Sequence, residues 1–312
     1  MVGGALTGCR PSSQVRWEMV FTTNNGRALL TSITAESLYW GAWPRTVRIF
    51  ETQARCIGAW QDHESGRLAT VEESSAVGDV LRVYDPEMNL VADHPIDHAD
   101  VGRVCGSPCL SPGGKRVALV GDRGRVLYAD LEVTSGGEEV HRWSVWPVRD
   151  EHTGGITDRS SARRYARCYF VGEDALVVGG PPTGPRFPLY RLDLAEKRGR
   201  LLGYGYLAGV RDDGSVITGT YWAAFKITNM ETGELLGVGG ALHQYCYLNR
   251  VSPCSEYILY HQPEILAGHW QYIRHLKSGR RARLKIPNKW KLGSWHAVGD
   301  ARDLSATAES PG

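Results

Sequence analysis

Five side chains of types that ligate metal ions lie close together in the sequence: Asp93, His94, Asp97, His98 and Asp100. Imidazole nitrogens combined with carboxylate oxygens suit zinc or manganese. The alternative is that these polar groups form hydrogen bonds within the fold. Composition does not decide between the two, because both need the same residue types.

The cysteines are a second set of reactive side chains, and there are seven of them, at positions 9, 56, 105, 109, 168, 246 and 254. Cys105 and Cys109 have three residues between them, whereas a zinc-binding pair usually has two. When the Ser-Pro turns at Ser111 and Ser252 are aligned, Cys105 and Cys246 fall in the same register. Equivalent positions in different copies favour one packing role. We therefore predict buried, reduced thiols, no bound metal and no cofactor.

Local motifs for catalysis are missing. The sequence has no GxSxG, HExxH, CxxC or phosphate-loop motif, and Gly203, Gly205 and Gly209 do not have the spacing of a dinucleotide-binding loop. An active site assembled from distant segments would leave no such motif. The absence therefore lowers the expectation of an enzyme without excluding one.

Residues 141–165 combine the residue types that anchor protein interfaces, namely tryptophan and arginine. We predict that a partner binds here. The candidate partner-binding residues are Trp143, Trp146, Arg149, Arg163 and Arg164. The alternative is a solvated loop whose tryptophans fold back on the domain.

Charge is distributed unevenly along the chain, although the net charge is only +2. Residues 51–100 contain 11 acids and 3 bases, whereas residues 265–299 contain 8 bases and no acid. Bases interleaved with tryptophans are typical of surfaces that bind nucleic acid or an acidic protein face. The candidate residues for an anionic partner are Arg280, Arg281, Arg283 and Lys285. Since strand alternation is expected to direct neighbouring bases to opposite faces, a solvated hairpin is the alternative.

A repeat indicates the elements that would position these residues. A Gly-, Asn- or Asp-rich turn followed by a short apolar run occurs seven times. The runs begin at Ala28, Leu68, Val117, Leu176, Val216, Ile258 and Leu304. Their spacing is that of a four-stranded blade, and alternating strands such as residues 189–193 follow the runs. No helical pattern exceeds one turn.

The third repeat resembles a WD repeat. It reads HADVGRV from His98, SPGG from Ser111 and GDRGRVLYAD from Gly121. This resemblance implies that His98, Asp122 and Asp130 make structural hydrogen bonds within the blade. It also favours the structural reading of the polar cluster around His98. The literal Trp-Asp pair is replaced, for example by Tyr84-Asp85.

The sequence thus predicts a single all-β domain over residues 1–312, with residues 141–165 as a long inter-blade insertion. We expect a β-propeller of seven four-stranded antiparallel blades, with six as the alternative. A propeller must close, because an open blade edge promotes aggregation. We expect the N-terminal strand, residues 2–9, to add the outer strand of the last blade.

The predicted function is a cytoplasmic scaffold for protein–protein interactions of the WD-repeat type. One alternative is a propeller enzyme, a hydrolase, lyase or cyclase, with a small-molecule site at the channel mouth. Another is binding of an anionic partner, such as nucleic acid, through residues 265–299. No apolar run is long enough to cross a membrane. Lipid anchoring at Cys9 is the alternative location, if the true start lies upstream of a Leu6-Thr7-Gly8-Cys9 lipobox.

Overall fold

The computed structural model of the chain shows β-sheets arranged in a ring. The structure describes residues 16–34, 45–74, 78–98, 102–122, 125–131, 144–147, 167–179, 188–196, 198–211, 213–219, 225–239, 247–252, 256–264, 268–275, 281–287 and 290–298. Within these ranges no helix is long and apolar enough to span a membrane.

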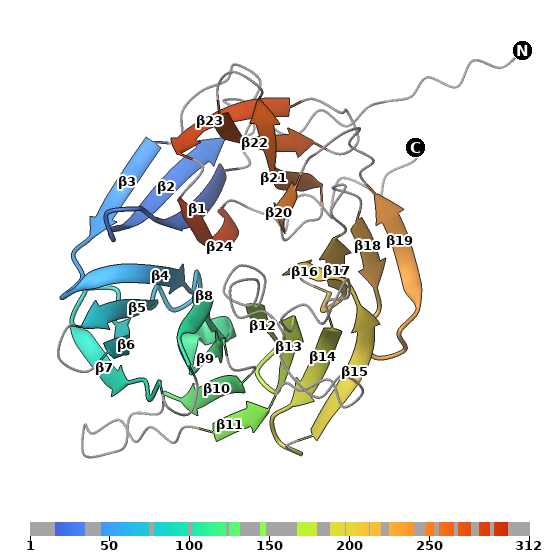
Figure 1. Cartoon of the computed structure of the whole chain (residues 1–312), viewed down its shortest axis with the longest axis horizontal. Coiled ribbons are helices and arrows are strands. Elements are labelled where there is room, and N and C mark those ends of the chain that lie inside the picture. Colours follow the sequence, from blue (N-terminus) through green and yellow to red (C-terminus); the bar gives the residue numbers. More distant parts are fainter. Residues whose placement is uncertain are drawn as a thin grey trace, which may run out of the picture.

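Six blades, each a four-stranded antiparallel sheet, surround a common axis (Figure 1). Blade 1, from the axis outward, is β24 (Lys291–Val298), β1 (Arg16–Thr22), β2 (Ala28–Thr34) and β3 (Arg45–Phe50). Blade 2 is β4 (Arg55–Gln61), β5 (Leu68–Ser74), β6 (Gly78–Tyr84) and β7 (Leu90–Pro95). Blade 3 is β8 (Val104–Leu110), β9 (Arg116–Gly121), β10 (Arg125–Asp130) and β11 (Ser144–Pro147), with the 3-10 turn η1 (Pro112–Gly114) between β8 and β9.

The other three blades follow the same order. Blade 4 is β12 (Arg167–Val171), β13 (Ala175–Gly179), β14 (Pro188–Asp193) and β15 (Arg198–Tyr204). Blade 5 is β16 (Tyr206–Val210), β17 (Val216–Gly219), β18 (Phe225–Thr228) and β19 (Leu235–Gly239). Blade 6 is β20 (Tyr247–Val251), β21 (Tyr257–Glu264), β22 (Gly268–His275) and β23 (Arg281–Pro287).

The blade number corrects the prediction of seven. Six of the seven predicted apolar runs begin at, or one residue inside, the start of a strand: β2, β5, β9, β13, β17 or β21. The seventh, at Leu304, lies outside the described residues. Before it, β24 pairs with β1, so the last described strand completes the first blade and does not start another.

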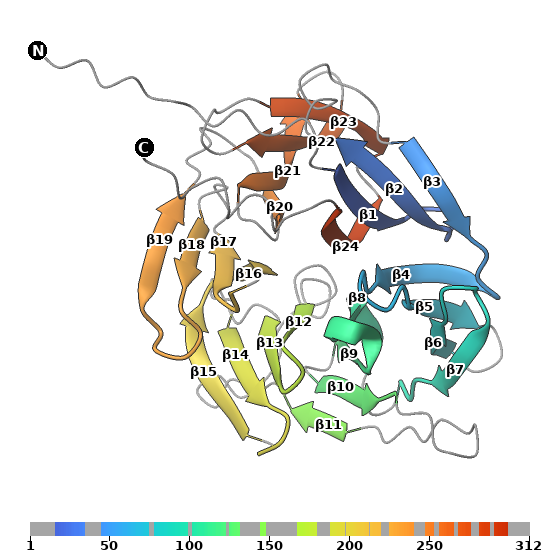
Figure 2. The same cartoon turned by 180° about the vertical axis from the view of Figure 1, so that it is seen from behind.

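Ring closure also differs from the prediction. The predicted outer strand at residues 2–9 lies outside the described residues. The C-terminal β24 instead forms the inner strand of blade 1, antiparallel to β1, and blade 6 already has its own outer strand, β23 (Figures 1 and 2). Pairing of N- and C-terminal strands satisfies the backbone groups at both ends of the ring, whichever terminus supplies the inner strand.

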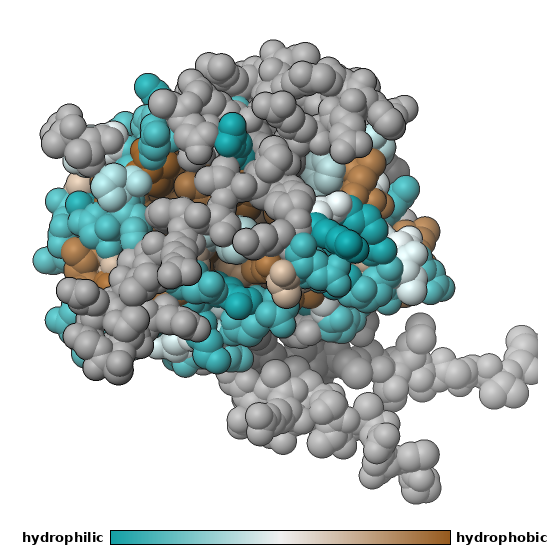
Figure 3. Space-filling model, turned by 90° about the horizontal axis from the view of Figure 1, so that it is seen from below, coloured by the Kyte–Doolittle hydropathy of each residue, from teal (hydrophilic) through white to brown (hydrophobic). Residues whose placement is uncertain are grey.

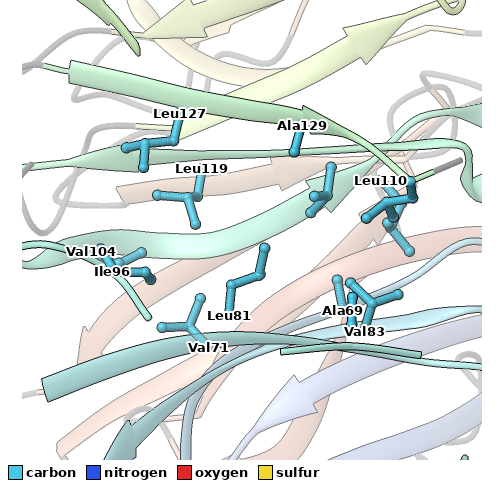
Figure 4. Packing of buried hydrophobic residues seen from close by; sticks show 13 residues of the cluster. Ala69, Val71, Leu81, Val83, Ile96, Val104, Leu110, Leu119, Leu127 and Ala129 are labelled. Carbon is cyan, nitrogen blue, oxygen red and sulfur yellow. The ribbon is translucent and has the colours of Figure 1, made fainter. Parts of the chain in front are cut away.

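Apolar packing between blades explains why the strands read as nearly continuous hydrophobic runs. On β9, Val117 and Leu119 face blade 2, whereas Ala118 and Val120 face blade 4. Both faces of the strand are therefore buried, and one apolar cluster fills each of the six inter-blade spaces. Figure 4 shows the cluster between blades 2 and 3, where side chains of the two sheets point toward each other.

Turn chemistry matches the repeat seen in the sequence. Ser111 and Ser252 each accept a hydrogen bond through Oγ from the backbone N–H five residues later, at 3.0 and 3.1 Å. Glycine permits the left-handed backbone of the tight turn before β2, where Gly26 has φ 76°. These turns fix the registers that bring six inner strands to the axis.

Candidate functional site at the axis of the ring

Side chains from all six inner strands form a polar and aromatic cluster around the axis, which we call the axial cluster. Its members are Trp60 on β4, Cys109 on β8, Arg167 and Tyr169 on β12, Tyr206 on β16, Arg250 on β20, and Ser294 and His296 on β24. Each blade thus contributes at least one side chain. A site built in this way is invisible to local motif searches.

Arg250 is the central charged group of the axial cluster. Its residue is only 6% exposed, and its guanidinium carbon lies 5.2 Å from the centre of the Tyr169 ring. Nη2 donates to the backbone carbonyl of Leu292 at 3.3 Å. The buried Nε and Nη1 atoms have no hydrogen-bond partner among the described residues. A guanidinium stacked on a ring keeps its N–H groups in the plane, where they can bind an acceptor.

The charged groups around Arg250 in the axial cluster are mainly positive. Burial, together with the positive charge of Arg167, lowers the pKa of Arg250 to about 10, so the side chain stays protonated at neutral pH. Arg167 itself lies over the Tyr206 ring, with the guanidinium carbon 4.9 Å from the ring centre. Burial raises the pKa of Tyr169, whose hydroxyl is buried without a hydrogen-bond partner. The cluster can therefore donate several hydrogen bonds to a negatively charged group.

The β24 side of the axial cluster is held by hydrogen bonds to β4. Ser294 Oγ accepts a hydrogen bond from the Gln61 backbone N–H at 3.1 Å, and His296 Nε2 lies 2.7 Å from the Gln61 carbonyl oxygen. The His296 ring packs edge-on against Trp60, and burial lowers the pKa of His296. A neutral imidazole that donates through Nε2–H fits these contacts.

The backbones of β24 and β4 lie very close together on this side of the axial cluster. A Cβ atom at Gly293 would lie 1.7 Å from the carbonyl oxygen of Ala59. Only glycine therefore allows β24 to lie this close to β4. The hydrogen bonds between Gln61 and the β24 residues Ser294 and His296 depend on that approach.

The outer strands carry a second kind of surface. Five consecutive residues of β3, numbers 45–49, are exposed. Val47 and Ile49 are 57% and 50% exposed, although β-branched residues usually pack against neighbours. The strand is the edge of its sheet and pairs only with β2 among the described strands.

Part of the described surface is seen in Figure 3, where hydrophilic residues predominate and hydrophobic ones form small separate groups.

The predicted basic residues lie partly on the outer strand of blade 6. Arg281 and Arg283 are exposed on β23, and Ala282 and Leu284 between and after them are buried. Because Arg281 and Arg283 are two residues apart on the strand, both lie on one face, and the prediction that adjacent bases point to opposite faces stays a prediction. The backbone of Lys285 continues β23, and Arg280 lies outside the described residues.

Of the five predicted partner-binding residues, only Trp146 lies within the described residues. Trp143, Arg149, Arg163 and Arg164 lie outside the described residues. Trp146 lies on β11, the outer strand of blade 3, where its backbone pairs with Val126. Part of the predicted insertion is thus a blade strand.

The residues expected to be structural make contacts within and between blades. His98 Nε2 lies 2.9 Å from the Asp79 carboxylate of the preceding blade. Asp122 is buried and accepts a hydrogen bond from the Arg103 backbone N–H at 3.1 Å. Asp130 pairs with Arg116, which also reaches Asp174 in blade 4.

The polar cluster that suggested a metal site is spread over several contacts. Asp93 pairs with Arg82 on β6, while His98 contacts Asp79. Asp100 lies outside the described residues. In the described part of the chain, no three metal-ligating side chains converge.

Sequence reasoning missed the axial cluster. Its signal was available in the aligned Ser-Pro turns, because Arg250 and Cys109 both lie two residues before the serine. Cys109 is fully buried, so a charged residue at the equivalent position indicates an unusual buried arginine.

Comparisons with known proteins support the fold. No protein-family model and no curated protein matches the sequence. Among solved structures, the chain resembles the crystal structure of TolB from Acinetobacter baumannii, with a TM-score of 0.57 and 15% identity, covering 94% of this chain and 68% of that chain. Together with the geometry above, this likeness defines the chain as a six-bladed β-propeller. Membership of the WD-repeat family stays a prediction.

Proposed function

We propose that this propeller is a protein-interaction scaffold that binds an extended, acidic segment of a partner along the exposed edge strand β3. The observation that carries the proposal is the run of five exposed residues on β3, which includes Val47 and Ile49. Edge strands present unpaired backbone groups, and proteins normally cover or blunt them. A partner strand added to this edge would satisfy those groups and cover both aliphatic side chains.

Charge on the neighbouring strands selects the kind of partner. Arg45 and Arg48 are exposed on β3, which contains no acid. Arg281 and Arg283 are exposed on β23, the outer strand of the adjacent blade 6 (Figure 1). An acidic segment would be attracted to this side of the ring and would associate faster at low salt.

Two further parts of the scaffold proposal do not concern β3. We include Trp143, Trp146, Arg149, Arg163 and Arg164 as a second partner-binding region, since tryptophan and arginine anchor interfaces. We also propose WD-repeat-type blades and a cytoplasmic location. The buried free thiols of Cys56, Cys105, Cys109 and Cys168 support a reducing compartment.

A direct test uses a fluorescent peptide with alternating glutamate and valine, and measures its binding by anisotropy. We expect Arg45→Glu/Arg48→Glu to weaken binding at least about tenfold, through loss of attraction. Val47→Ser/Ile49→Ser should weaken binding strongly without changing the charge of the strand, because the aliphatic contacts are lost. Binding of the wild type should weaken steeply with salt.

The chain offers a matched control on another edge strand. Leu235 and Leu236 on β19 are 54% and 48% exposed, but the turn before them carries Glu231 and Glu234. Leu235→Ser/Leu236→Ser should leave peptide binding unchanged. If the β19 variant loses binding as the β3 variants do, or if a lysine–valine peptide binds equally well, the proposed edge and its charge selectivity are wrong.

A further inference from the structure

The starting observation is a set of unused hydrogen-bond donors inside the axial cluster. Nε and Nη1 of Arg250 carry three N–H bonds between them, and neither atom has an acceptor or exposed surface. The hydroxyl of Tyr169, whose ring centre lies 5.2 Å from the guanidinium carbon, is also buried and unpartnered. Native proteins leave few such groups, so each one needs an explanation.

The positive charge of the site makes the burial of these unused donors energetically unfavourable. Arg250 carries a positive charge, and the repulsion from nearby Arg167 adds to the cost of burial. Arg250 forms no ion pair with a carboxylate among the described residues; its contacts are the Tyr169 ring and the Leu292 carbonyl. A buried charge is tolerated best when it is paired and hydrogen-bonded.

We propose that the axial cluster is a binding site for a compact oxyanion, the carboxylate or phosphate group of a small molecule, held by Arg250 and the Tyr169 hydroxyl. The guanidinium carbon lies over the Tyr169 ring and Nη2 donates to the Leu292 carbonyl, so two contacts hold the guanidinium in place. Charge-assisted hydrogen bonds to an oxyanion would satisfy them. Arg167 adds long-range attraction from the same side as Tyr169.

Entry to the site requires a conformational change. The two guanidinium nitrogens that lack a partner, Nε and Nη1, are buried from solvent. β24 contacts Arg250, because its Leu292 carbonyl accepts the hydrogen bond from Nη2. The anion must therefore enter through a minor open state of the ring, and association will be slow compared with diffusion. Ordered water is the competing explanation for the unused donors.

The test titrates the purified chain with sodium phosphate, sodium acetate or sodium chloride at constant ionic strength, and follows the melting temperature and the heat of binding. We expect saturable stabilisation by phosphate, by acetate or by both. At a ligand concentration about one hundred times Kd, the midpoint should rise by about 4 °C. The arm that saturates at lower concentration identifies the preferred oxyanion.

Variants separate this site from general salt effects. Arg250→Gln should remove the saturable rise, whereas Arg198→Gln, on the exposed outer strand β15, should retain it. Tyr169→Phe, which deletes only one donor, should raise Kd about threefold to tenfold. If Arg250→Gln does not fold, Tyr169→Phe decides alone.

Three results would overturn the proposal. The first is equal stabilisation of the wild type and Arg250→Gln, which would show an effect of salt on hydration. The second is saturation by chloride alone, which would exclude oxyanion recognition. The third is an unchanged Kd in Tyr169→Phe, which would exclude the Tyr169 hydroxyl from the site, or no saturable response of the wild type to any of the three salts, in which case water would account for the unused donors.

Discussion

The guanidinium carbon of Arg250 in blade 6 lies over the ring of Tyr169 in blade 4, 5.2 Å from the ring centre. Blade 5 lies between these two blades in the ring (Figure 1). The contact therefore links blades that share no inter-blade apolar cluster. Side chains at the axis thus add couplings that the pairwise packing of neighbouring blades does not provide.

Replacement of Glu72 should strongly destabilise blade 2. The Glu72 carboxylate is fully buried and accepts hydrogen bonds from Thr70, Tyr84, Arg82 and the Ala54 backbone N–H at 2.6–2.7 Å. Glu72→Gln leaves Arg82, whose side chain is 11% exposed, without its main counter-charge. We expect the free energy of unfolding in urea to fall by about 3 kcal/mol.

The adjacent residue on the same strand provides the control for this change. Glu73 pairs with Arg55, but both side chains are about half exposed, at 49% and 57%. Glu73→Gln should alter the free energy of unfolding by less than about 1 kcal/mol. Equal losses in the two variants would mean that burial does not set the strength of the Glu72 interactions.

Gly293→Ala should weaken closure of the ring. The added methyl group would lie 1.7 Å from the Ala59 carbonyl oxygen, which is backbone and cannot rotate away. The loss should be at least about 2–3 kcal/mol, the upper part of the range for overpacking. Thermal unfolding measures it, with Gly237→Ala as the control, because the nearest atom there is 3.9 Å from the added carbon. Similar melting temperatures for both variants would contradict the close approach of β24 to β4.

Stability should decrease in acid through His296. Its pKa is lowered in the folded chain by burial and by His63, against the opposing effects of the Gln61 carbonyl and of Asp62 and Glu18. Because the unfolded chain then binds a proton more readily, the folded state loses stability as the pH falls below the ordinary value of 6.5. Above that pH both states are neutral and the contribution is constant.

The measurement is the melting temperature between pH 5 and pH 8 for the wild type and His296→Gln. Other groups titrate in both proteins, so the difference between the two curves isolates His296. The difference should be flat above about pH 7 and change steadily below it, with the variant losing less stability. Parallel curves throughout this range would contradict the assignment.

Buried cysteines should resist alkylation in the folded protein. Burial raises the pKa of Cys56 to about 12 and raises that of Cys109 as well, so neither forms much thiolate at pH 8. Cys109 also faces Cys168 across the interface of blades 3 and 4, with 3.3 Å between the sulfur atoms. Labelling of these three by iodoacetamide, followed by mass spectrometry, should require denaturant. Rapid labelling of Cys109 without denaturant would show that blades 3 and 4 separate readily.

The sequence predicts the blades well because local chemistry specifies them. The apolar runs at Leu68 and Val216 each follow a Gly-containing turn and begin a strand. Blade number is harder, because it depends on whether the strand at residues 291–298 pairs with a distant partner or starts a new blade. Pairing of β24 with β1 is a non-local choice that no turn encodes.

The axial cluster shows where sequence reasoning stops. Arg250 and Tyr169 are separated by an entire blade in the chain, and each lies in a short strand that resembles its neighbours. Their meeting depends on ring geometry. By contrast, the common face of Arg281 and Arg283 follows from strand alternation and was open to prediction.

Placement of β24 inside blade 1 has a consequence for synthesis. Trp17, Met19 and Phe21 share one apolar cluster with Leu292 and Trp295, which are among the last described residues to leave the ribosome. Throughout translation the first blade therefore exposes an unpaired inner edge and uncovered aromatic side chains. Nascent chains of this kind are vulnerable to misassembly until β24 has been synthesised, so chaperone demand should fall once β24 can pair with β1.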